Sequence, residues 1–482
     1  MKPLPIFTLP HRRLAEVAAV LALICITAWP AWATHDDVRT PHTEVLVAAE
    51  APQLTAGYWI SRLPTADSPY LSAATIAAQN ARMAATDPHI ENLAQLPDTL
   101  PGREVVASIQ ALSQRPRRIL FDERGVSLSA TALDALANTL ALDRVPASVT
   151  PRFGLVVARA DLRTFPTQQR FFSTRGDWDI DRFQEAALFP GEAVAILHES
   201  RDGRWWFIAS QRYRAWVAKD HIALGSRTQV LGYARRTPAR VVTGAVLHTT
   251  YTPEQPAVSG LQLDMGVRLP LRADWPADAT VNGQYPYTSW VLDLPVRRDD
   301  GSLAFAPVLL PRTADTAADY LPATPANLIG QAFKFLGERY GWGNAFGTRD
   351  CSGFVSEIYR SVGLLLPRNT EAQADSPALE AVPLPPAQDR AARLAALQAL
   401  QVGDLVYIPG HVMMVIGHDR GQTWVIHDTA GIRYLDTDGR LAYARLNGVA
   451  VTPLEPLRLD RNTFYIDRIT HIQRVPSADS SR

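Results

Sequence analysis

Cysteine is nearly absent from this chain of 482 residues, which contains only Cys25 and Cys351. Cys25 lies in an apolar N-terminal segment described below, so the rest of the chain has a single thiol and no internal disulfide. In an exported protein, a single remaining cysteine is either buried and inert or kept because its reactivity is used. Cys351 is therefore the first residue to consider for chemistry.

An excess of charge of either sign is also missing, because 48 Lys and Arg residues balance 48 Asp and Glu residues. Neutrality removes the electrostatic attraction on which nucleic-acid binding and anionic-lipid binding usually depend. We therefore expect neither nucleic acid nor an anionic membrane surface among the partners. Oligomeric state is not predicted by the composition.

Long apolar runs are confined to the N-terminus, where basic residues up to Arg13 precede an apolar stretch from Val17 to Trp29. Ala31-Trp32-Ala33 then supplies a cleavage motif. The pattern predicts a signal peptide over residues 1–33 and export to the periplasm or beyond, with an uncleaved anchor as the alternative. The stretch is shorter than the ~20 residues of a membrane span, and no later segment is long enough, so we expect no span after cleavage.

The length of the chain predicts several domains, and the composition and hydrophobic pattern change along the sequence. Residues 34–150 are Ala-rich and interrupted by prolines, which predicts an N-terminal region of short helices. Residues 151–225 and 226–315 contain short apolar runs separated by Gly, Asp and Pro, as in small antiparallel barrels. Residues 324–475 alternate helices with strands. The predicted fold class is a multidomain α+β protein.

The first barrel region contains a recognisable hairpin. Asp202 to Ile208 and Tyr213 to Val217 resemble two strands of a bacterial SH3 (SH3b) domain, with Ala215 at the position of the usual glycine. The region 226–315 is more divergent, and we interpret it as a second SH3-like barrel.

The C-terminal region predicts how Cys351 is positioned. A helix begins at Thr324 and Pro325, and Asp350 caps a second helix that begins at Cys351 and ends at Gly363. Strands are expected at 404–408, 411–416 and 424–427, the order of a helix packed on an antiparallel sheet. The thiol thus lies on the first turn of a helix, where the dipole and a nearby imidazolium favour the thiolate.

Two histidines complete the candidate catalytic group. His411 opens one strand, and we expect it on the face of Met413 and Val415, beneath the covering helix, where it is the candidate base. His427 ends the next strand and is the candidate for fixing the tautomer of His411. The free N–H groups at the helix start can bind the oxyanion formed when an acyl carbon is attacked. These residues predict a cysteine hydrolase.

Less specific interpretations stay open. Cys351 can be a buried, unreactive residue, and Asp350 only a helix cap. His418, seven residues after His411, is expected on the opposite face as a solvated side chain. No His, Cys, Asp or Glu at metal-ligand spacing accompanies Cys351, so the sequence predicts neither a metal nor another cofactor.

Four segments together resemble the NlpC/P60 peptidases: Tyr340 to Asn344, Arg349 to Phe354, Leu366 to Gln373, and Pro409 to Met413. Asn344 and Thr370 depart from the family's usual glycine and serine. The resemblance covers residues 324–474 and implies a papain-like catalytic domain with the triad Cys351, His411 and His427. It also implies cleavage of cell-wall (peptidoglycan) stem peptides or muropeptides between γ-D-glutamate and the diamino acid.

The resemblance further implies that the first SH3 domain covers part of the cleft, so that peptides with a free N-terminal L-Ala are preferred. Asp350 is then the candidate anion for the L-Ala ammonium group, and Tyr213 the SH3 residue that covers the cleft. The remaining candidates for substrate binding are Tyr340, Trp342, Ser352, Asn369 and Thr370. Two alternatives remain: an inactive, wall-binding scaffold protein, and an amidase or acyltransferase that uses the same triad.

Overall fold

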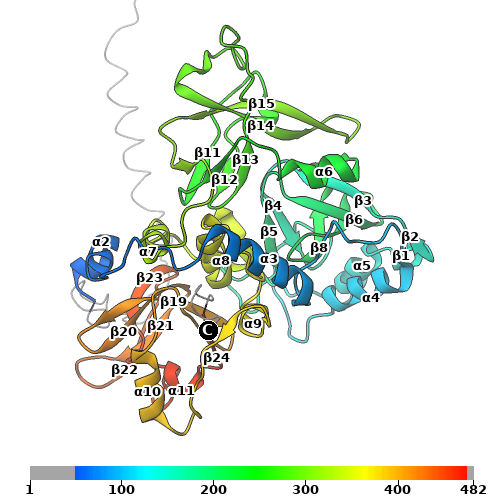
Figure 1. Cartoon of the computed structure of the whole chain (residues 1–482). Helices are drawn as coiled ribbons and strands as arrows, with labels where there is room; N and C mark the ends of the chain where they lie inside the picture. Colours follow the sequence, from blue (N-terminus) through cyan, green and yellow to red (C-terminus); the bar gives the residue numbers. More distant parts are fainter. Residues whose placement is uncertain (1–48, 475–482) are drawn as a thin grey trace, which may run out of the picture. The chain divides into compact units, whose positions relative to one another are not determined.

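The computed structural model describes residues 49–474 (Figure 1). The predicted signal peptide, residues 1–33, lies outside these residues. Within residues 49–474, no helix is long and apolar enough to cross a membrane.

Short helices dominate residues 49–150, drawn in blue to cyan in Figure 1. Trp59 and Met83 from this region lie in the same core as the helix that begins at Cys351, whereas Val105 and Ile109 lie in the core of the first barrel. The region therefore packs on two different parts of the chain. Its elements are η1 (Ala51–Leu54), α2 (Ala56–Ile60), α3 (Ala73–Thr86), β1 (Leu100–Pro101), α4 (Gly102–Leu112), α5 (Ala130–Thr139), η2 (Leu142–Arg144) and β2 (Ser148–Val149).

A seven-stranded antiparallel sheet follows, in the order β5-β4-β8-β7-β6-β3-β9. The predicted hairpin pairs β7 with β8, with Phe207 opposite Trp216, and both rings are fully buried. The strands are β3 (Arg152–Val156), β4 (Ala160–Arg163), β5 (Gln184–Leu188), β6 (Ala193–Glu199), β7 (Trp205–Ala209), β8 (Arg214–Ala218) and β9 (Ile222–Gly225), with η3 (Lys219–His221) between the last two.

The second strand-rich region differs from the first barrel in topology. Its strands form three separate small sheets, β13-β10-β16, β11-β12 and β14-β15, around one apolar core. The prediction of a second SH3-like barrel is therefore not confirmed. The elements are α6 (Arg227–Tyr233), β10 (Ala239–Val242), β11 (Val246–His248), η4 (Pro256–Val258), β12 (Gln262–Asp264), β13 (Arg268–Pro270), η5 (Pro286–Thr288), β14 (Ser289–Arg297), β15 (Leu303–Pro311) and β16 (Thr316–Ala317).

The C-terminal region contains a six-stranded antiparallel sheet in the order β17-β24-β18-β19-β20-β23. The predicted helix starts are correct, because Thr324 accepts a hydrogen bond from the Asn327 amide and Asp350 accepts one from the Gly353 amide. The helices are α7 (Pro325–Phe333), η6 (Trp342–Gly347), α8 (Cys351–Ser361), α9 (Thr370–Ala374), α10 (Arg390–Gln398) and α11 (Tyr465–Arg468). The strands are β17 (Glu380–Ala381), β18 (Leu405–Ile408), β19 (His411–Asp419), β20 (Gln422–Thr429), β21 (Ile432–Leu435), β22 (Leu441–Ala444), β23 (Gly448–Pro453) and β24 (His471–Arg474).

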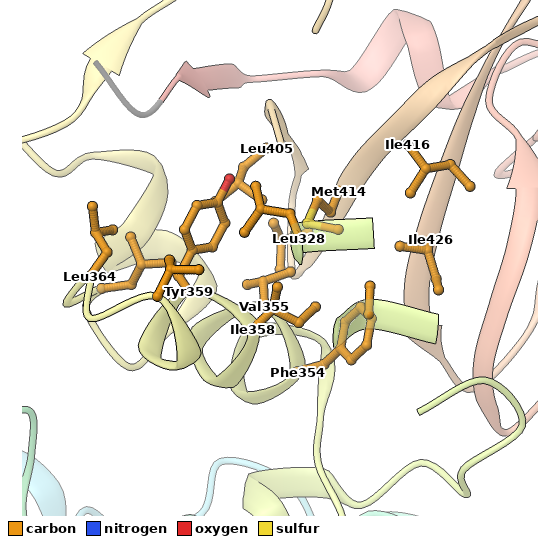
Figure 2. Close-up of a cluster of buried hydrophobic side chains, with 14 of the residues drawn as sticks. Leu328, Phe354, Val355, Ile358, Tyr359, Leu364, Leu405, Met414, Ile416 and Ile426 are labelled. Atoms are coloured by element: carbon orange, nitrogen blue, oxygen red, sulfur yellow. The ribbon is translucent and has the colours of Figure 1, made fainter. Parts of the chain in front are cut away.

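An apolar core joins α8 to the sheet (Figure 2). Met414 and Ile416 of β19 lie in it together with Phe354 and Ile358 of the helix. The face beneath the helix is thus the one opposite to Met413 and Val415, which corrects the sequence expectation for β19. The start of β19 nevertheless lies at the start of α8, because the amide of Val412, the residue after His411, donates toward Cys351.

Candidate active site

The nucleophile candidate occupies the first position of α8. Asp350, at the N-cap, accepts a hydrogen bond of 2.8 Å from the Gly353 amide. The amides of Cys351 and Ser352 lie in the same turn, where a helix supplies no internal acceptor. These two N–H groups are therefore the donors that an oxyanion beside the sulfur would meet.

Cys351 is almost completely buried, with 5% of its surface exposed. Its Sγ lies 3.6 Å from Thr370 Oγ1, and the Val412 amide donates toward it. Burial, and then the charge of Asp350, raise the pKa of the thiol to about 12, although Thr370 and the Val412 amide act in the opposite direction. Burial and the charge of Asp350 thus favour the protonated thiol over the expected thiolate in the resting site.

His411, His427 and Thr452 form one hydrogen-bonded chain. His411 Nε2 lies 2.8 Å from His427 Nδ1, and His427 Nε2 lies 3.0 Å from Thr452 Oγ1. Burial lowers the pKa of His411 to about 4, and burial followed by the neighbouring His411 holds the pKa of His427 well below its usual range. Both rings are therefore neutral at neutral pH. Thr452 was missed by sequence reasoning, since only strand pairing brings it to His427.

His418 is not part of this chain. Its Nε2 lies 2.8 Å from the Leu400 carbonyl oxygen, and the side chain is half-buried. The prediction of a solvated side chain is wrong. An irregularity in strand pairing between Val415 and Gly417 changes which face of the sheet the following residues, including His418, point to.

The loop before the nucleophile adopts unusual backbone angles. Gly343, Asn344, Phe346 and Gly347 all have positive φ, at 60°, 59°, 60° and 75°. A Cβ on Gly343 would lie 3.0 Å from the backbone of Gln184, so both the angle and the close approach require glycine. Asn344 tolerates the left-handed region, and its Oδ1 accepts a 2.7 Å hydrogen bond from Arg368. Asn is therefore a workable replacement for the family's usual glycine.

Side chains from both strand-rich regions bind the carbonyl groups of this loop. From the first barrel, Gln184 Nε2 donates to the Gly343 oxygen over 3.0 Å. Arg159 Nη2 donates to the oxygens of Asn344 and Thr348 over 2.7 and 3.0 Å. From the second region, Gln262 Nε2 donates to the Gly347 oxygen over 2.8 Å. The nucleophile loop thus depends on residues far away in sequence.

Arg349, the residue before the helix cap Asp350, is fully buried, and carboxylates surround it. Its guanidinium donates to Glu357 over 2.8 Å, to both oxygens of Glu338 over 2.8 and 2.9 Å, and to Asp264 over 2.8 Å. Because Asp264 belongs to β12, this ion-pair network connects the second strand-rich region to the residue pair Arg349-Asp350.

Asp350 and Ser352 are occupied by protein contacts. Arg368 donates to both carboxylate oxygens of Asp350 over 3.1 and 2.9 Å and to Ser352 Oγ over 2.9 Å. Gly343 N donates to the same carboxylate over 3.0 Å. The Asp350 carboxylate thus has an ion pair and caps a helix, and its predicted contact with the substrate ammonium group stays a prediction.

Tyr213 and Glu185 of the first barrel form a polar group that includes a second anion. The Tyr213 hydroxyl donates to Glu185, which Thr164 Oγ1 also contacts over 2.6 Å. Asn369 lies close enough to the Tyr213 phenol to influence its pKa, so the barrel approaches the start of α9, where Thr370 lies. Within residues 49–474 Glu185 has no Lys or Arg partner. Sequence reasoning missed Glu185, because no local motif marks it.

Two aromatic candidates lie close to the loop. Tyr340 is 7% exposed, and burial raises the pKa of its phenol, with the charge of Asp350 acting in the same direction. Trp342 donates through Nε1 to the Gln184 oxygen over 3.1 Å, so its indole is fixed to the first barrel.

Asp428 was also missed, although it follows His427. It is fully buried, and neither carboxyl oxygen has a hydrogen-bond partner among the described residues. Burial, followed by the charges of Asp350 and Glu338, holds the pKa of Asp428 well above its usual range. Within the described part of the chain, no group of three or more His, Cys, Asp or Glu side chains converges as metal ligands.

Comparison with known families gives two matches. The NlpC/P60 family model matches residues 337–451, and the model of an SH3 domain (SH3b1 type) matches residues 170–218. The probable endopeptidase p60 of Listeria welshimeri is 34% identical over 118 residues, which are 23% of this chain and 19% of the relative. This chain thus spans about a fifth of the length of that curated relative.

One solved structure extends the similarity in fold beyond the two matched domains. An NlpC/P60 endopeptidase from Photobacterium damselae subsp. piscicida superposes with a TM-score of 0.65 at 17% identity, covering 83% of this chain and 90% of that one. An NlpC/P60 family protein from Bacillus cereus covers 67% of this chain and 100% of its own, at 19% identity and a TM-score of 0.44. The chain thus contains an NlpC/P60 domain at residues 337–451, and an SH3 domain of the SH3b1 type at residues 170–218 precedes it.

Proposed function

We propose that this protein is a cysteine endopeptidase that cleaves the γ-D-glutamyl–diamino acid bond of peptidoglycan stem peptides. The observation that carries the proposal is the thiol at the start of α8 beside the strand end that bears the His411–His427–Thr452 chain. The family match supports the coarser activity, a peptidoglycan endopeptidase.

The reaction needs the sulfur to lose its proton as it attacks. His411 Nδ1 accepts the thiol proton while Sγ adds to the carbonyl carbon. For Nδ1 to be free, His411 Nε2–H donates to His427 Nδ1, and His427 Nε2–H donates to Thr452 Oγ1. The imidazolium then protonates the leaving amine as the C–N bond breaks, and water hydrolyses the thioester, returning the thiol.

The negative charge that forms on the carbonyl oxygen needs donors. The amides of Cys351 and Ser352 supply them, because the first turn of α8 leaves these N–H groups without a helical acceptor. The same turn is rigid, since Asp350 is held by Arg368 and by two backbone amides.

The amino end of the peptide is assigned to the first barrel. A free L-Ala ammonium group requires an anion that is not already paired, and Glu185 meets this requirement better than Asp350 does. Tyr213 and the neighbouring Asn369 would then lie beside the peptide. Thr370, Tyr340 and Trp342 remain candidates for the rest of the peptide site.

The location of the proposed substrate indicates where the protein acts. Peptidoglycan lies outside the cytoplasmic membrane, so we propose that the protein acts in the cell envelope after export. Its partners would be stem peptides or muropeptides, and the proposed chemistry involves only protein groups.

Product analysis tests the proposal. The protein is incubated with the tripeptide L-Ala-γ-D-Glu-diamino acid, and the products are separated and identified by mass. We expect free diamino acid and L-Ala-γ-D-Glu, and none with Cys351→Ala. Absence of turnover on this peptide and on longer stem peptides would favour the scaffold, whereas a different bond cleaved would indicate the amidase or acyltransferase.

A further inference from the structure

A cavity of about 490 Å³ has Tyr213 and Arg368 in its lining but neither Cys351 nor His411, so it adjoins the proposed peptide site without containing the reacting groups. Arg212, Arg360 and Arg368 are among its lining residues, and Arg212 also lines an adjoining cavity of about 640 Å³. Arg360 is on the last turn of α8, nine residues after Cys351, which corresponds to about 14 Å along a helix axis. The reaction proposed above does not use the region around Arg360.

Arg212 is the unusual member of this group. Its side chain is only 14% exposed, and the nearest carboxylate oxygen, Oε1 of Glu192, lies 3.8 Å from Nη2. That separation is beyond hydrogen-bond distance. Among residues 49–474 its guanidinium has no hydrogen-bond acceptor. A guanidinium carries five N–H donors, and a buried charge without acceptors is costly.

No neighbouring carboxylate is available to balance the positive charge of Arg212 alone. Glu192 is shared, because its Oε1 lies 3.4 Å from Arg360 Nη1 and its Oε2 accepts a 3.1 Å hydrogen bond from the Phe189 amide. Arg368 is already paired with Asp350. Burial lowers the pKa of Arg212 to about 10, with attraction from Glu192 opposing and repulsion from Arg360 adding to the effect.

We propose that the cavity beside Arg212 and Arg360 binds a small oxyanion, either a phosphate or a carboxylate group. The planar guanidinium of Arg212 offers paired N–H donors that match two oxygens of such a group. The bound anion would supply the acceptors that the protein lacks there. Because Arg212 belongs to the first barrel and Arg360 to α8, the anion would also stabilise the folded chain.

Thermal unfolding of the full chain tests the site. Inorganic phosphate and succinate are each titrated against sodium chloride at equal ionic strength. We expect one of them to raise the Tm saturably, by a few degrees at concentrations well above its Kd. A response to phosphate alone identifies a phosphate site, and a response to succinate alone identifies a carboxylate site. The absence of a saturable response to either ion would overturn the proposal.

Variants separate this site from general anion effects. Arg212→Met should abolish the shift while leaving the Tm without added anion unchanged or higher, because a buried, poorly paired cation is removed. Arg204→Met, which removes an exposed arginine of the same barrel, should keep the full shift. Isothermal titration of the wild type and of Arg212→Lys, expected to bind at least tenfold more weakly, covers the case in which Arg212→Met does not fold. An equal response in wild type and Arg212 variants would contradict the assignment.

Discussion

At the scale of single residues, the proposed chemistry depends on two neutral groups meeting at the end of β19. Burial keeps the Cys351 thiol protonated and His411 unprotonated, so no ion pair exists before substrate binds. The proton therefore moves during attack, as in a serine hydrolase. Sequence reasoning proposed Cys351, His411 and His427 from local patterns, but it could not predict the protonation of the thiol, which depends on tertiary burial.

The pH dependence of kcat/KM follows from these pKa shifts. Because the pKa of His411 is lowered to about 4, the neutral base is present above that pH and is lost as the pH falls through it. The raised pKa of Cys351 keeps the thiol protonated through neutral pH. We therefore expect kcat/KM to rise through an apparent pKa near 4 and then to stay level. A profile that rises near the ordinary histidine value of ~6.5 would count against a neutral base with a lowered pKa.

Removal of the orienting histidine gives a second residue-scale prediction. His427→Ala should lower kcat by about 10²-fold or more, because His411 loses the partner that fixes its tautomer. Thr452→Val should have a smaller effect of about tenfold, since only the outer hydrogen bond is lost. His418→Ala, a half-buried histidine in the same sheet, is the matched control and should keep full kcat. Equal kcat in wild type and His427→Ala would remove His427 from the mechanism.

At the scale of elements, α8 and the loop before it determine where Cys351 lies in the proposed active site. Helix caps at Thr324 and Asp350 and the apolar spacing of α8 are local signals, and they were read correctly. The face of β19 that packs beneath α8 was predicted wrongly. The irregularity in strand pairing between Val415 and Gly417 could not be seen in the alternation of apolar and polar residues. The loop's partners, such as Gln262, carry no local signature, so only the fold reveals them.

The loop's carbonyl contacts predict the effect of Gln262→Ala. Loss of the hydrogen bond to the Gly347 oxygen should make the loop before Cys351 more mobile. Because the loop positions the thiol, we expect kcat to fall about tenfold while KM changes little. Gln284→Ala, at an exposed position of the same region, should leave both constants unchanged. If Gln262→Ala behaves like Gln284→Ala, the second region does not position the nucleophile loop.

At the scale of the whole molecule, the described parts are joined by buried polar contacts. The N-terminal helices contribute side chains to two cores, and Asp264 brings a carboxylate of the second region to Arg349. The sequence indicated the order of the regions and the first SH3 domain. It could not indicate the topology of residues 239–317, where short apolar runs are compatible with several arrangements of strands.

The ion-pair network predicts a large cost for Asp264→Ala. This change leaves Arg349 buried with one carboxylate fewer, and we expect the free energy of unfolding to fall by about 3–5 kcal/mol. Denaturant unfolding followed by circular dichroism measures it. Asp278→Ala, at an exposed position of the same region, should change stability by less than about 0.5 kcal/mol. Similar stability of the two variants would show that the network contributes little.

Covalent labelling by a substrate-like electrophile tests the central claim, that Cys351 attacks with His411 as its base. The reagent is L-Ala-γ-D-Glu with a chloromethyl ketone at the scissile position, and the protein is followed by intact mass and peptide mapping. We predict one adduct per chain, located on Cys351, absent in Cys351→Ala and formed at least about 10²-fold more slowly in His411→Ala. An adduct on another residue, or equal labelling rates in wild type and His411→Ala, would contradict the account.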